Sequence, residues 1–371
     1  MELKLNVQQI MDLLKTKVSK NTVLNLEERG QIPKSKLEKR GEQVLARYWD
    51  TFDDWCAIGK HVGWLNELPQ ECVVVSVYLR KGGIGKTTTV ENLARTLALN
   101  GAKILVIGLD ANKSISDAFG FGPIVGQTIN DISEWDGLHQ HFCDGIKIGT
   151  LIQRHSENIY VIPENDDLGE LSTRIQSATR REDFFASMVT ELKKTFNYII
   201  FDCPPGKEDE PLIAAALTTS NVIVSPVGCD VRSLRAIATA LTSLGEWKQK
   251  AKVHIQDHII IPMMVETSKL STQILAYYQQ TFPGTTETAI RRAVIVQEAA
   301  YEKLSVFEYS AGLSAQKRAA LRVIEDFYSV YTEIHRRLLD VSKHASDKAD
   351  HQRRPKSAAP RSEANETSVG V

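Results

Sequence analysis

The residues best suited to chemistry lie in one stretch, where an apolar run leads into glycines, lysines and threonines. The stretch runs from Val73 to Ala94 and contains the segment RKGGIGKTTT. Glycines allow a backbone to wrap closely around an anion because they lack a Cβ. A helix that begins directly after them points free N–H groups at the same place. A buried strand, a glycine-rich turn and a helix start together predict a phosphate-binding loop.

The polar residues of this loop suit a nucleotide and its metal ion. Lys86 is expected to reach the β- and γ-phosphates, and the Thr87 hydroxyl is expected to bind Mg²⁺, which prefers oxygen ligands. The predicted cofactors are therefore ATP and Mg²⁺. The loop residues predicted to contact the nucleotide are Gly82, Gly83, Ile84, Gly85, Lys86, Thr87 and Thr88.

Two further apolar runs end in aspartate. One spans residues 103–110 and ends in Asp110, and the other spans residues 196–202 and ends in Asp202, which Pro204 and Pro205 follow closely. Apolar runs separated by helices indicate parallel strands that are buried on both faces. Ligands of such sheets bind beyond the carboxyl ends of the strands, so both aspartates are expected at the same edge as the loop.

The loop departs from the ordinary signature G-x-x-x-x-G-K-[ST], which has glycine where this chain has Arg80. An extra lysine, Lys81, precedes Gly82, and this form resembles the deviant Walker A motif of the ParA/MinD family of ATPases. The strand that ends in Asp202 and Pro-Pro is similar to the Walker B motif of that family. Residues 107–114 resemble its second aspartate motif, D-x-D-P-Q-x-[SN], with Gly108 in place of the first aspartate and Ala111 in place of the proline.

The resemblance covers about residues 72–340 and implies roles for individual residues. It implies a weak, Mg²⁺-dependent ATPase that forms a homodimer around two ATP molecules. Lys81 would cross to the partner subunit's nucleotide, Asp110 would orient the attacking water, and Asp202 would hold the Mg²⁺ ion. Lys81, Lys86 and Asp110 are thus the predicted catalytic residues. The family also places backbone near the nucleotide after the strand that contains Pro226.

Residues 1–70 differ in character from the rest of the chain. Two short apolar segments at helical spacing, preceded by the capping residues Asn6 and Ser19, predict a helix-turn-helix. Between residues 15 and 47, nine Lys and Arg oppose four Glu, a local excess of five positive charges. The segment resembles the winged helix-turn-helix DNA-binding families. An alternative is a helical hairpin that serves only as a dimerisation arm.

The winged-helix resemblance implies two sets of DNA contacts. Residues facing the major groove would specify sequence, and basic residues on phosphates would position the protein. The first set is Ser19, Lys20, Asn21 and Asn25, and the second is Lys34, Lys36, Lys39 and Arg40. The ParA resemblance adds non-specific DNA contacts in the ATP-bound dimer, which it assigns to Lys269, Arg291 and Arg292. For these three, ordinary surface charge is the alternative.

The predicted fold class is α/β: a mostly parallel, doubly wound P-loop NTPase sheet flanked by helices, with a small all-α, winged-helix-like domain before it. The expected divisions are residues 1–70, 71–341 and a disordered tail, 342–371. Three tryptophans between residues 48 and 68 are expected to form a packing seam between the first two parts. A last helix, about 313–339, is expected to dock on the core through its apolar stripe, which comprises Ile324, Phe327, Tyr331, Ile334 and Leu338.

Composition limits the classes of function. The 371 residues are 42% hydrophobic and 25% charged, with a net charge of −1, so nucleic acid would have to bind to local patches. Five scattered cysteines without C-x-x-C spacing argue against a disulfide framework and a zinc site. A polar start and the lack of any long apolar run indicate a cytoplasmic protein with no membrane partner.

Taken together, the resemblances imply ATP-dependent partition of plasmid or chromosomal DNA by a nucleoid-associated protein. Hydrolysis would be stimulated by a ParB-type centromere-binding partner, and the N-terminal domain would bind operator DNA as an autorepressor. Two alternatives stay open. The ATPase could position a protein cargo, or it could set the oligomeric state of a transcriptional regulator.

Overall fold

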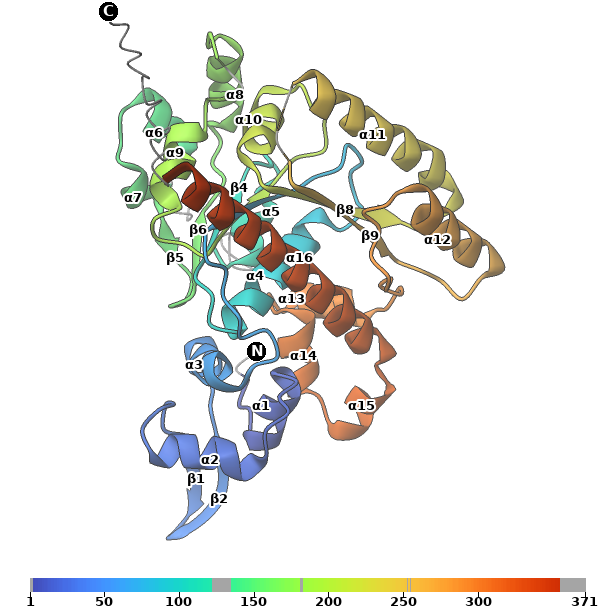
Figure 1. Cartoon of the computed structure of the whole chain (residues 1–371). Coiled ribbons are helices and arrows are strands. Elements are labelled where there is room, and N and C mark those ends of the chain that lie inside the picture. Colours follow the sequence, from blue (N-terminus) through green and yellow to red (C-terminus); the bar gives the residue numbers. More distant parts are fainter. Residues whose placement is uncertain (1–2, 122–134, 181–182, 252, 254, 354–371) are drawn as a thin grey trace, which may run out of the picture.

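A seven-stranded sheet forms the centre of the protein, in the order β5-β6-β4-β7-β3-β8-β9 (Figure 1). The computed structural model describes residues 3–121, 135–180, 183–251, 253 and 255–353. Every neighbouring pair of strands is parallel except β5 and β6, which confirms the mostly parallel sheet. The strands are β3 (Val73–Val77), β4 (Ile104–Gly108), β5 (Gln153–Arg154), β6 (Ile159–Ile162), β7 (Tyr198–Asp202), β8 (Val222–Gly228) and β9 (Asp257–Met263).

The middle strands are buried on both faces, which explains their unbroken apolar sequences. Every residue of β3, β4 and β7 is buried. Along β3, Val73, Val75 and Val77 belong to one hydrophobic cluster, whereas Val74 and Tyr78 belong to a second. Successive side chains of a strand point to opposite faces, so the two clusters lie on the two sides of the sheet.

Helices cover both faces, as expected for a doubly wound fold. The first face carries α4 (Lys86–Leu99) and α16 (Arg322–Arg353), with α3 (Phe52–Val62), α13 (Ile295–Tyr301) and α14 (Val306–Gly312) in the same cluster. The second face carries α6 (Leu138–Cys143), α7 (Ile148–Leu151), α8 (Leu168–Gln176), α9 (Ala186–Leu192) and α10 (Pro211–Thr219). In the described part of the chain beyond residue 100, the remaining helices are α5 (Ser114–Ala118), α11 (Val231–Lys250), α12 (Lys269–Thr281) and α15 (Ala315–Ala320).

The N-terminal part is not all-α, so that prediction is wrong. It contains α1 (Val7–Leu13) and α2 (Lys20–Glu28), but an antiparallel hairpin of β1 (Lys36–Arg40) and β2 (Gln43–Tyr48) follows them. Figure 1 shows this hairpin projecting away from the central sheet. All five residues of β1 are exposed, so no alternation of apolar and polar residues marks the strand in the sequence. Gly41, at φ +64°, makes the turn.

The expected tryptophan seam is confirmed. Trp49 and Trp55 are buried, and the Trp64 ring lies 5.0 Å from the Tyr328 ring and 5.8 Å from the Phe307 ring, centre to centre. The Tyr328 hydroxyl also donates to the Asp12 carbonyl oxygen at 2.7 Å. The apolar side chains of α1 and α3 join those of β3 and α16 in one cluster. The N-terminal part and the sheet therefore share a continuous core.

Helix α16 confirms the docking stripe and corrects the extent of the tail. All five stripe residues are buried. The helix continues to Arg353, however, so the predicted disorder from residue 342 is wrong for residues 342–353; residues 354–371 lie outside the described chain. Ser342 is buried, and its Oγ accepts from the Glu71 backbone N–H at 2.8 Å and lies 2.9 Å from the Glu71 carbonyl oxygen. This contact ties the helix to the segment that precedes β3.

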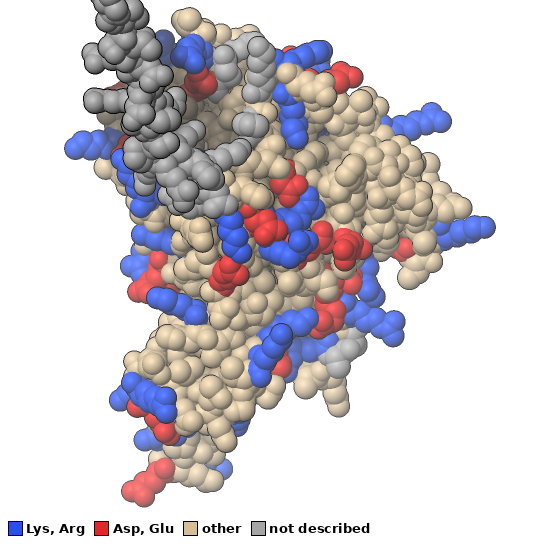
Figure 2. Space-filling model, viewed as in Figure 1, with Lys and Arg blue, Asp and Glu red and all other residues tan. Residues whose placement is uncertain are grey.

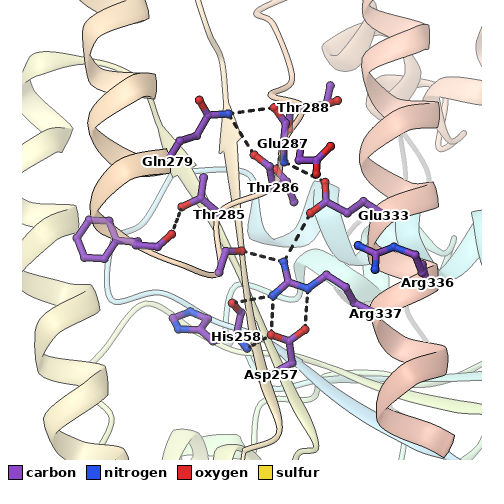
Figure 3. A network of polar contacts seen from close by, with 12 residues as sticks. Asp257, His258, Gln279, Thr285, Thr286, Glu287, Thr288, Glu333, Arg336 and Arg337 are labelled. Carbon is purple, nitrogen blue, oxygen red and sulfur yellow. Dashed lines mark hydrogen bonds and ion pairs between the residues drawn. The ribbon is translucent and has the colours of Figure 1, made fainter.

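A polar network joins α16 to the edge strand β9 (Figure 3). The Arg337 guanidinium donates to the Asp257 carboxylate at 2.7 and 2.5 Å and to the Gly284 carbonyl oxygen at 3.0 Å. The segment that contains Gly284 pairs with the outer side of β9, since the Ile260 N–H donates to the Gly284 carbonyl oxygen at 2.9 Å. The network thus helps to cover a sheet edge that would otherwise present unpaired backbone groups.

Replacing Arg337 tests how much this network contributes to the stability of the fold. We expect Arg337→Ala to lower the free energy of unfolding by about 2–4 kcal/mol, because it leaves the half-buried Asp257 without its bidentate partner. The control is Arg336→Ala on the next residue of the same helix, whose side chain is 66% exposed; its effect should stay within about 0.5 kcal/mol. Urea unfolding followed by tryptophan fluorescence measures both, and equal effects would contradict the assignment.

Candidate functional site: the carboxyl edge of the sheet

Strand register brings the predicted loop and both predicted aspartates to one edge. Asp202, the last residue of β7, pairs with Val77 at the end of β3 on one side and with Gly108 at the end of β4 on the other. The three strands therefore end at the same level. Asp110 follows β4 by two residues, and the Leu109 N–H donates to the Asp202 carbonyl oxygen at 3.1 Å. The expected convergence is present in the fold.

The loop between β3 and α4 has the backbone shape that its glycines suggested. Gly83 and Gly85 lie at φ +69° and +86°, a region that side chains with a Cβ rarely adopt. Helix α4 begins at Lys86, directly after Gly85, which has no side chain to cap it. The first N–H groups of this helix and its positive dipole end are thus available to an anion.

Lys86 lies folded over the loop. Its Nζ donates to the Lys81 carbonyl oxygen at 3.2 Å. Burial lowers the pKa of the Lys86 ammonium, while the nearby carboxylates of Asp202 and Asp110 act in the opposite direction. An ammonium in such a place is well suited to pair with phosphate oxygens. Lys81 itself is partly buried, and its role across a dimer stays a prediction.

Asp202 and Thr87 have the arrangement that a magnesium site requires. The Thr87 hydroxyl donates to Asp202 Oδ2 at 2.8 Å, while the buried Asp202 Oδ1 has no hydrogen-bond partner among the described residues. Burial raises the pKa of Asp202 to about 7, and the Thr87 hydrogen bond opposes that shift. A buried carboxylate oxygen without a donor is costly unless a cation neutralises it. Two hard oxygen ligands beside a phosphate loop therefore fit Mg²⁺.

The Asp110 side chain is held in a tight turn. Its Oδ1 accepts from the Asn112 N–H at 3.0 Å and from Asn112 Nδ2 at 2.9 Å. Asp110 is partly exposed and lies close enough to Lys86 and Asp202 to affect the pKa of each. Pro226 is buried in β8, two residues beyond the Val77–Val224 pair, and so lies beside the start of the loop. The nucleotide contacts of all these residues stay predictions.

Sequence reasoning left Arg80 without a role, and the structure supplies a partner for it. The Arg80 Nε donates to both carboxylate oxygens of Glu208, at 2.9 and 3.0 Å, and its Nη2 also contacts Glu208 and donates to Ser243 Oγ at 2.5 Å. Glu208 is buried, with 3% of its side chain exposed. The Tyr78 hydroxyl donates to the Gly206 carbonyl oxygen at 2.8 Å. Two residues of the phosphate loop therefore hold the loop that follows Pro204 and Pro205.

The residues predicted to contact DNA lie mainly at the surface. Lys20, Asn21 and Asn25 are exposed on α2, whereas the Ser19 Oγ caps that helix by accepting from the Thr22 N–H at 3.2 Å. Buried Glu27 fixes the hairpin against α2, since its Oε1 accepts from both the N–H and the Oγ of Ser35 at 2.7 Å. The four predicted phosphate contacts, Lys34, Lys36, Lys39 and Arg40, are exposed in or just before the hairpin, and Lys36 pairs with Asp50 at 2.8 Å.

The other three predicted DNA contacts have different surroundings. Arg291 is bound by Asp326, with its Nε at 2.6 Å and its Nη2 at 2.7 Å from the two carboxylate oxygens. Arg292 is 60% exposed and pairs with Glu266 at 3.0 Å, and Lys269 is exposed at the start of α12. In the view of Figure 2, positive and negative side chains are interspersed over α16 rather than separated into one basic patch. The Arg291 charge in particular is already neutralised within the chain.

The part of the chain that forms this site is similar to known proteins. The family model described as "AAA domain" matches residues 72–266, just over half of the chain, and begins one residue before β3. The chain belongs to this family of P-loop ATPases, in the ParA/MinD group. The matched segment contains the phosphate loop, Asp110 and Asp202, but none of α1, α2 and the hairpin.

Curated relatives share the ATPase part of the chain. The sporulation initiation inhibitor protein Soj of Bacillus subtilis is 27% identical over 229 residues, which cover 61% of this chain and 87% of that protein. The chromosome-partitioning ATPase Soj of Treponema pallidum is 26% identical over 62% of this chain and 88% of its own. The chromosome partitioning protein ParA of Caulobacter vibrioides is 23% identical over 68% of this chain and 93% of its own.

Solved structures support the fold. A Cyanothece McdA variant in complex with ATP aligns with a TM-score of 0.59 at 16% identity, over 71% of this chain and 96% of that one. A putative plasmid partition protein from Borrelia burgdorferi bound to AMPPNP aligns with a TM-score of 0.54 at 17% identity, over 70% of this chain and 99% of that one. In the part of the present chain that the structure describes, no helix is both long and apolar enough to cross a membrane.

The Arg80–Glu208 pair gives a direct test of the loop arrangement. We expect Arg80→Ala to lower the free energy of unfolding by about 3 kcal/mol, since it leaves a buried carboxylate without a partner. The control Ser243→Ala removes only one hydrogen bond and should cost about 1 kcal/mol. The double variant Arg80→Ala/Glu208→Gln should recover part of the loss, because the uncompensated charge is gone. Strict additivity of the two substitutions in urea unfolding would contradict the pairing.

Proposed function

We propose that this protein is a Mg²⁺-dependent ATPase of DNA partition, which dimerises around ATP and binds DNA in that state. The observation that carries the proposal is the site at the carboxyl edge of the sheet. There the phosphate loop, the unpartnered Asp202 Oδ1 and the Asp110 turn meet. The partition function rests on the similarity to Soj and ParA proteins, whose names state chromosome partitioning.

Each residue of the site has a distinct part in the proposed reaction. The loop N–H groups and Lys86 bind the phosphates of ATP, while Thr87 and Asp202 hold the metal. When bound, Mg²⁺ supplies positive charge that neutralises the phosphate oxygens as the bond to the leaving group breaks. Asp110 orients a water molecule for attack. Lys81 reaches the nucleotide of the second subunit and so makes dimerisation depend on ATP.

DNA binding is proposed to occur at two surfaces. The exposed residues of α2 would contact an operator, which makes the protein an autorepressor, and the hairpin would lie along the phosphates. Exposure of Lys20, Asn21 and Asn25 and the Glu27–Ser35 contact support this proposal. Lys269 and Arg292 would bind DNA non-specifically in the dimer, so the protein would associate with the nucleoid. A ParB-type partner would stimulate hydrolysis and release the DNA.

The proposed roles of Asp110 and Lys86 differ in a measurable way. Lys86→Ala should abolish ATP binding, since the phosphates lose their buried cation. Asp110→Ala should leave the Kd for a fluorescent ATP analogue within about twofold of the parent while lowering kcat at least about a hundredfold, because the water loses its orienting group. The control is Asp117→Ala in α5, whose side chain is 64% exposed. Normal turnover by the Asp110 variant would refute its assigned role.

DNA binding can be separated into its specific and non-specific parts. We expect Lys20→Ala/Asn21→Ala to remove the preference for a duplex from the promoter of the chain's own gene, and to spare ATPase activity. Lys34→Ala should weaken binding to all duplexes alike. It should also reduce the slope of log K against log salt by about 0.9, as for one lost phosphate contact. Lys147→Ala, on an exposed turn before α7, serves as the charge control. A dimerisation arm without DNA contacts would leave every one of these affinities unchanged.

A further inference from the structure

A third carboxylate lies at the same edge of the sheet, and the proposed reaction has not used it. Glu164 follows β6 by two residues and is 3% exposed. Its carboxylate accepts from the Ile115 N–H at 3.1 Å, from the Ser116 N–H at 2.8 Å and from the Ser116 Oγ at 2.6 Å. Burial raises the pKa of Glu164, and these hydrogen bonds oppose the shift. No sequence motif singled this residue out.

Glu164 occupies space that only a glycine at position 108 leaves open. A Cβ on Gly108 would lie 2.3 Å from Glu164 Cδ and 2.5 Å from Glu164 Oε1. Gly108 is the residue of β4 that pairs with Asp202, so the Glu164 carboxyl group lies over the strand next to the proposed metal ligand. The negative charge of Glu164 also raises the pKa of the Asp202 carboxyl group, because the two carboxylates repel each other.

The same carboxylate is linked to Asp110 through a short run of backbone. Ile115 and Ser116, which donate to Glu164, are in the first turn of α5, and the cap of that helix is Lys113, in the left-handed region at φ +54°. The Lys113 N–H in turn donates to the Asp110 carbonyl oxygen at 2.9 Å. The turn from Asp110 to Lys113 is thus held at one end by β4 and at the other by Glu164.

We infer that Glu164 is a positioning residue for Asp110, and that it supplies from the end of β6 the carboxylate for which Gly108 makes room. Its three accepted hydrogen bonds fix the start of α5, and the start of α5 fixes the turn that carries Asp110. The inference deepens the proposed ATPase function and rests on it. It also gives a reason for Gly108, one of the positions at which this chain departs from the aspartate motif.

The geometry allows an aspartate at position 108 to take over the role of the Glu164 carboxylate. An aspartate places its carboxylate oxygens about 2.4 Å from its own Cβ, as its covalent bond lengths require. Glu164 Oε1 lies 2.5 Å from the point where a Gly108 Cβ would be. An aspartate at position 108 could therefore put an oxygen close to where Glu164 Oε1 now lies, provided that the Glu164 side chain is shortened.

A set of four variants tests this exchange: Glu164→Ala, Glu164→Gln, Gly108→Asp and the double variant Gly108→Asp/Glu164→Ala. Three quantities are measured for each: kcat and KM for ATP, the Kd for a fluorescent ATP analogue, and amide hydrogen exchange of residues 113–118 without nucleotide. Hydrogen exchange does not depend on catalysis. It therefore tests the positioning role even if the chain proves not to hydrolyse ATP, an outcome that would refute only the proposed function.

We expect Glu164→Ala to lower kcat about tenfold or more, with KM and Kd within about twofold, because Asp110 is displaced while the phosphate loop is intact. Exchange at residues 115 and 116 should accelerate at least about tenfold as their acceptor is lost. Glu164→Gln, which keeps one acceptor oxygen, should fall between Glu164→Ala and the parent. Gly108→Asp alone should be as impaired as Glu164→Ala or fail to fold, because two carboxyl groups then compete for one space.

The double variant shows whether an aspartate at position 108 can replace the Glu164 carboxylate. If an aspartate at position 108 replaces the Glu164 carboxylate, kcat and amide protection should both return to within about threefold of the parent. A double variant no better than Glu164→Ala in both measurements would overturn the inference. So would a Glu164→Ala variant that hydrolyses ATP and protects residues 115 and 116 as the parent does.

Discussion

The buried carboxylate of Asp202 is the constraint on which the site depends. Strand β7 carries it between β3 and β4, and all three strands end level with it. One of its oxygens is bound by Thr87 and the other has no protein donor among the described residues. A fold that keeps such a group buried at neutral pH requires a compensating positive charge. The phosphate loop, Lys86 and the Asp110 turn all lie around this buried carboxylate.

Around this centre, loops are held by side chains that have no direct part in phosphate chemistry. Arg80 and Tyr78 connect the phosphate loop to the segment after Pro205, through Glu208 and the Gly206 carbonyl oxygen. Glu164 does the same for the turn after β4. In each case a buried carboxylate, that of Glu208 or of Glu164, accepts several hydrogen bonds, so the loop has few alternative conformations. The reactive groups are thereby placed before a ligand arrives, which is the usual requirement for efficient positioning.

Most of the sheet could be predicted from sequence because its strands are buried on both faces. The apolar runs at β3, β4 and β7, each followed by glycine or aspartate, specified both the strands and the edge at which ligands bind. The hairpin could not be predicted in this way, since β1 is exposed along its whole length and has no apolar face. Residues 342–353 were misjudged for a similar reason: they are polar, and the contacts that hold their start, Ser342 with Glu71 and Lys343 with Glu67, join residues far apart in the chain.

The roles of single polar residues were harder to foresee. Arg80 looked unexplained because its partner, Glu208, is 128 residues away in the chain. Glu164 and Gly108 are likewise joined only by the parallel pairing of β4 with β6. Local patterns record periodicity and caps, but they do not record which loops meet after folding. Motif matching therefore identified the groups expected to touch the nucleotide and missed those that hold them in position.

If the N-terminal part binds DNA as proposed, the core that it shares with the sheet would fix the position of its DNA-binding helix. Tyr328 and Arg318 both bind Asp12, at its carbonyl oxygen and its carboxylate, so α1 is fastened to the last part of the chain. Helix α2 is thus carried by the ATPase body and not by a flexible tether. In a two-fold dimer joined across nucleotide, the two copies of α2 would stand at one fixed separation. The geometry of the nucleotide-dependent dimer would then set the distance between the two half-sites of an operator that the protein can bind.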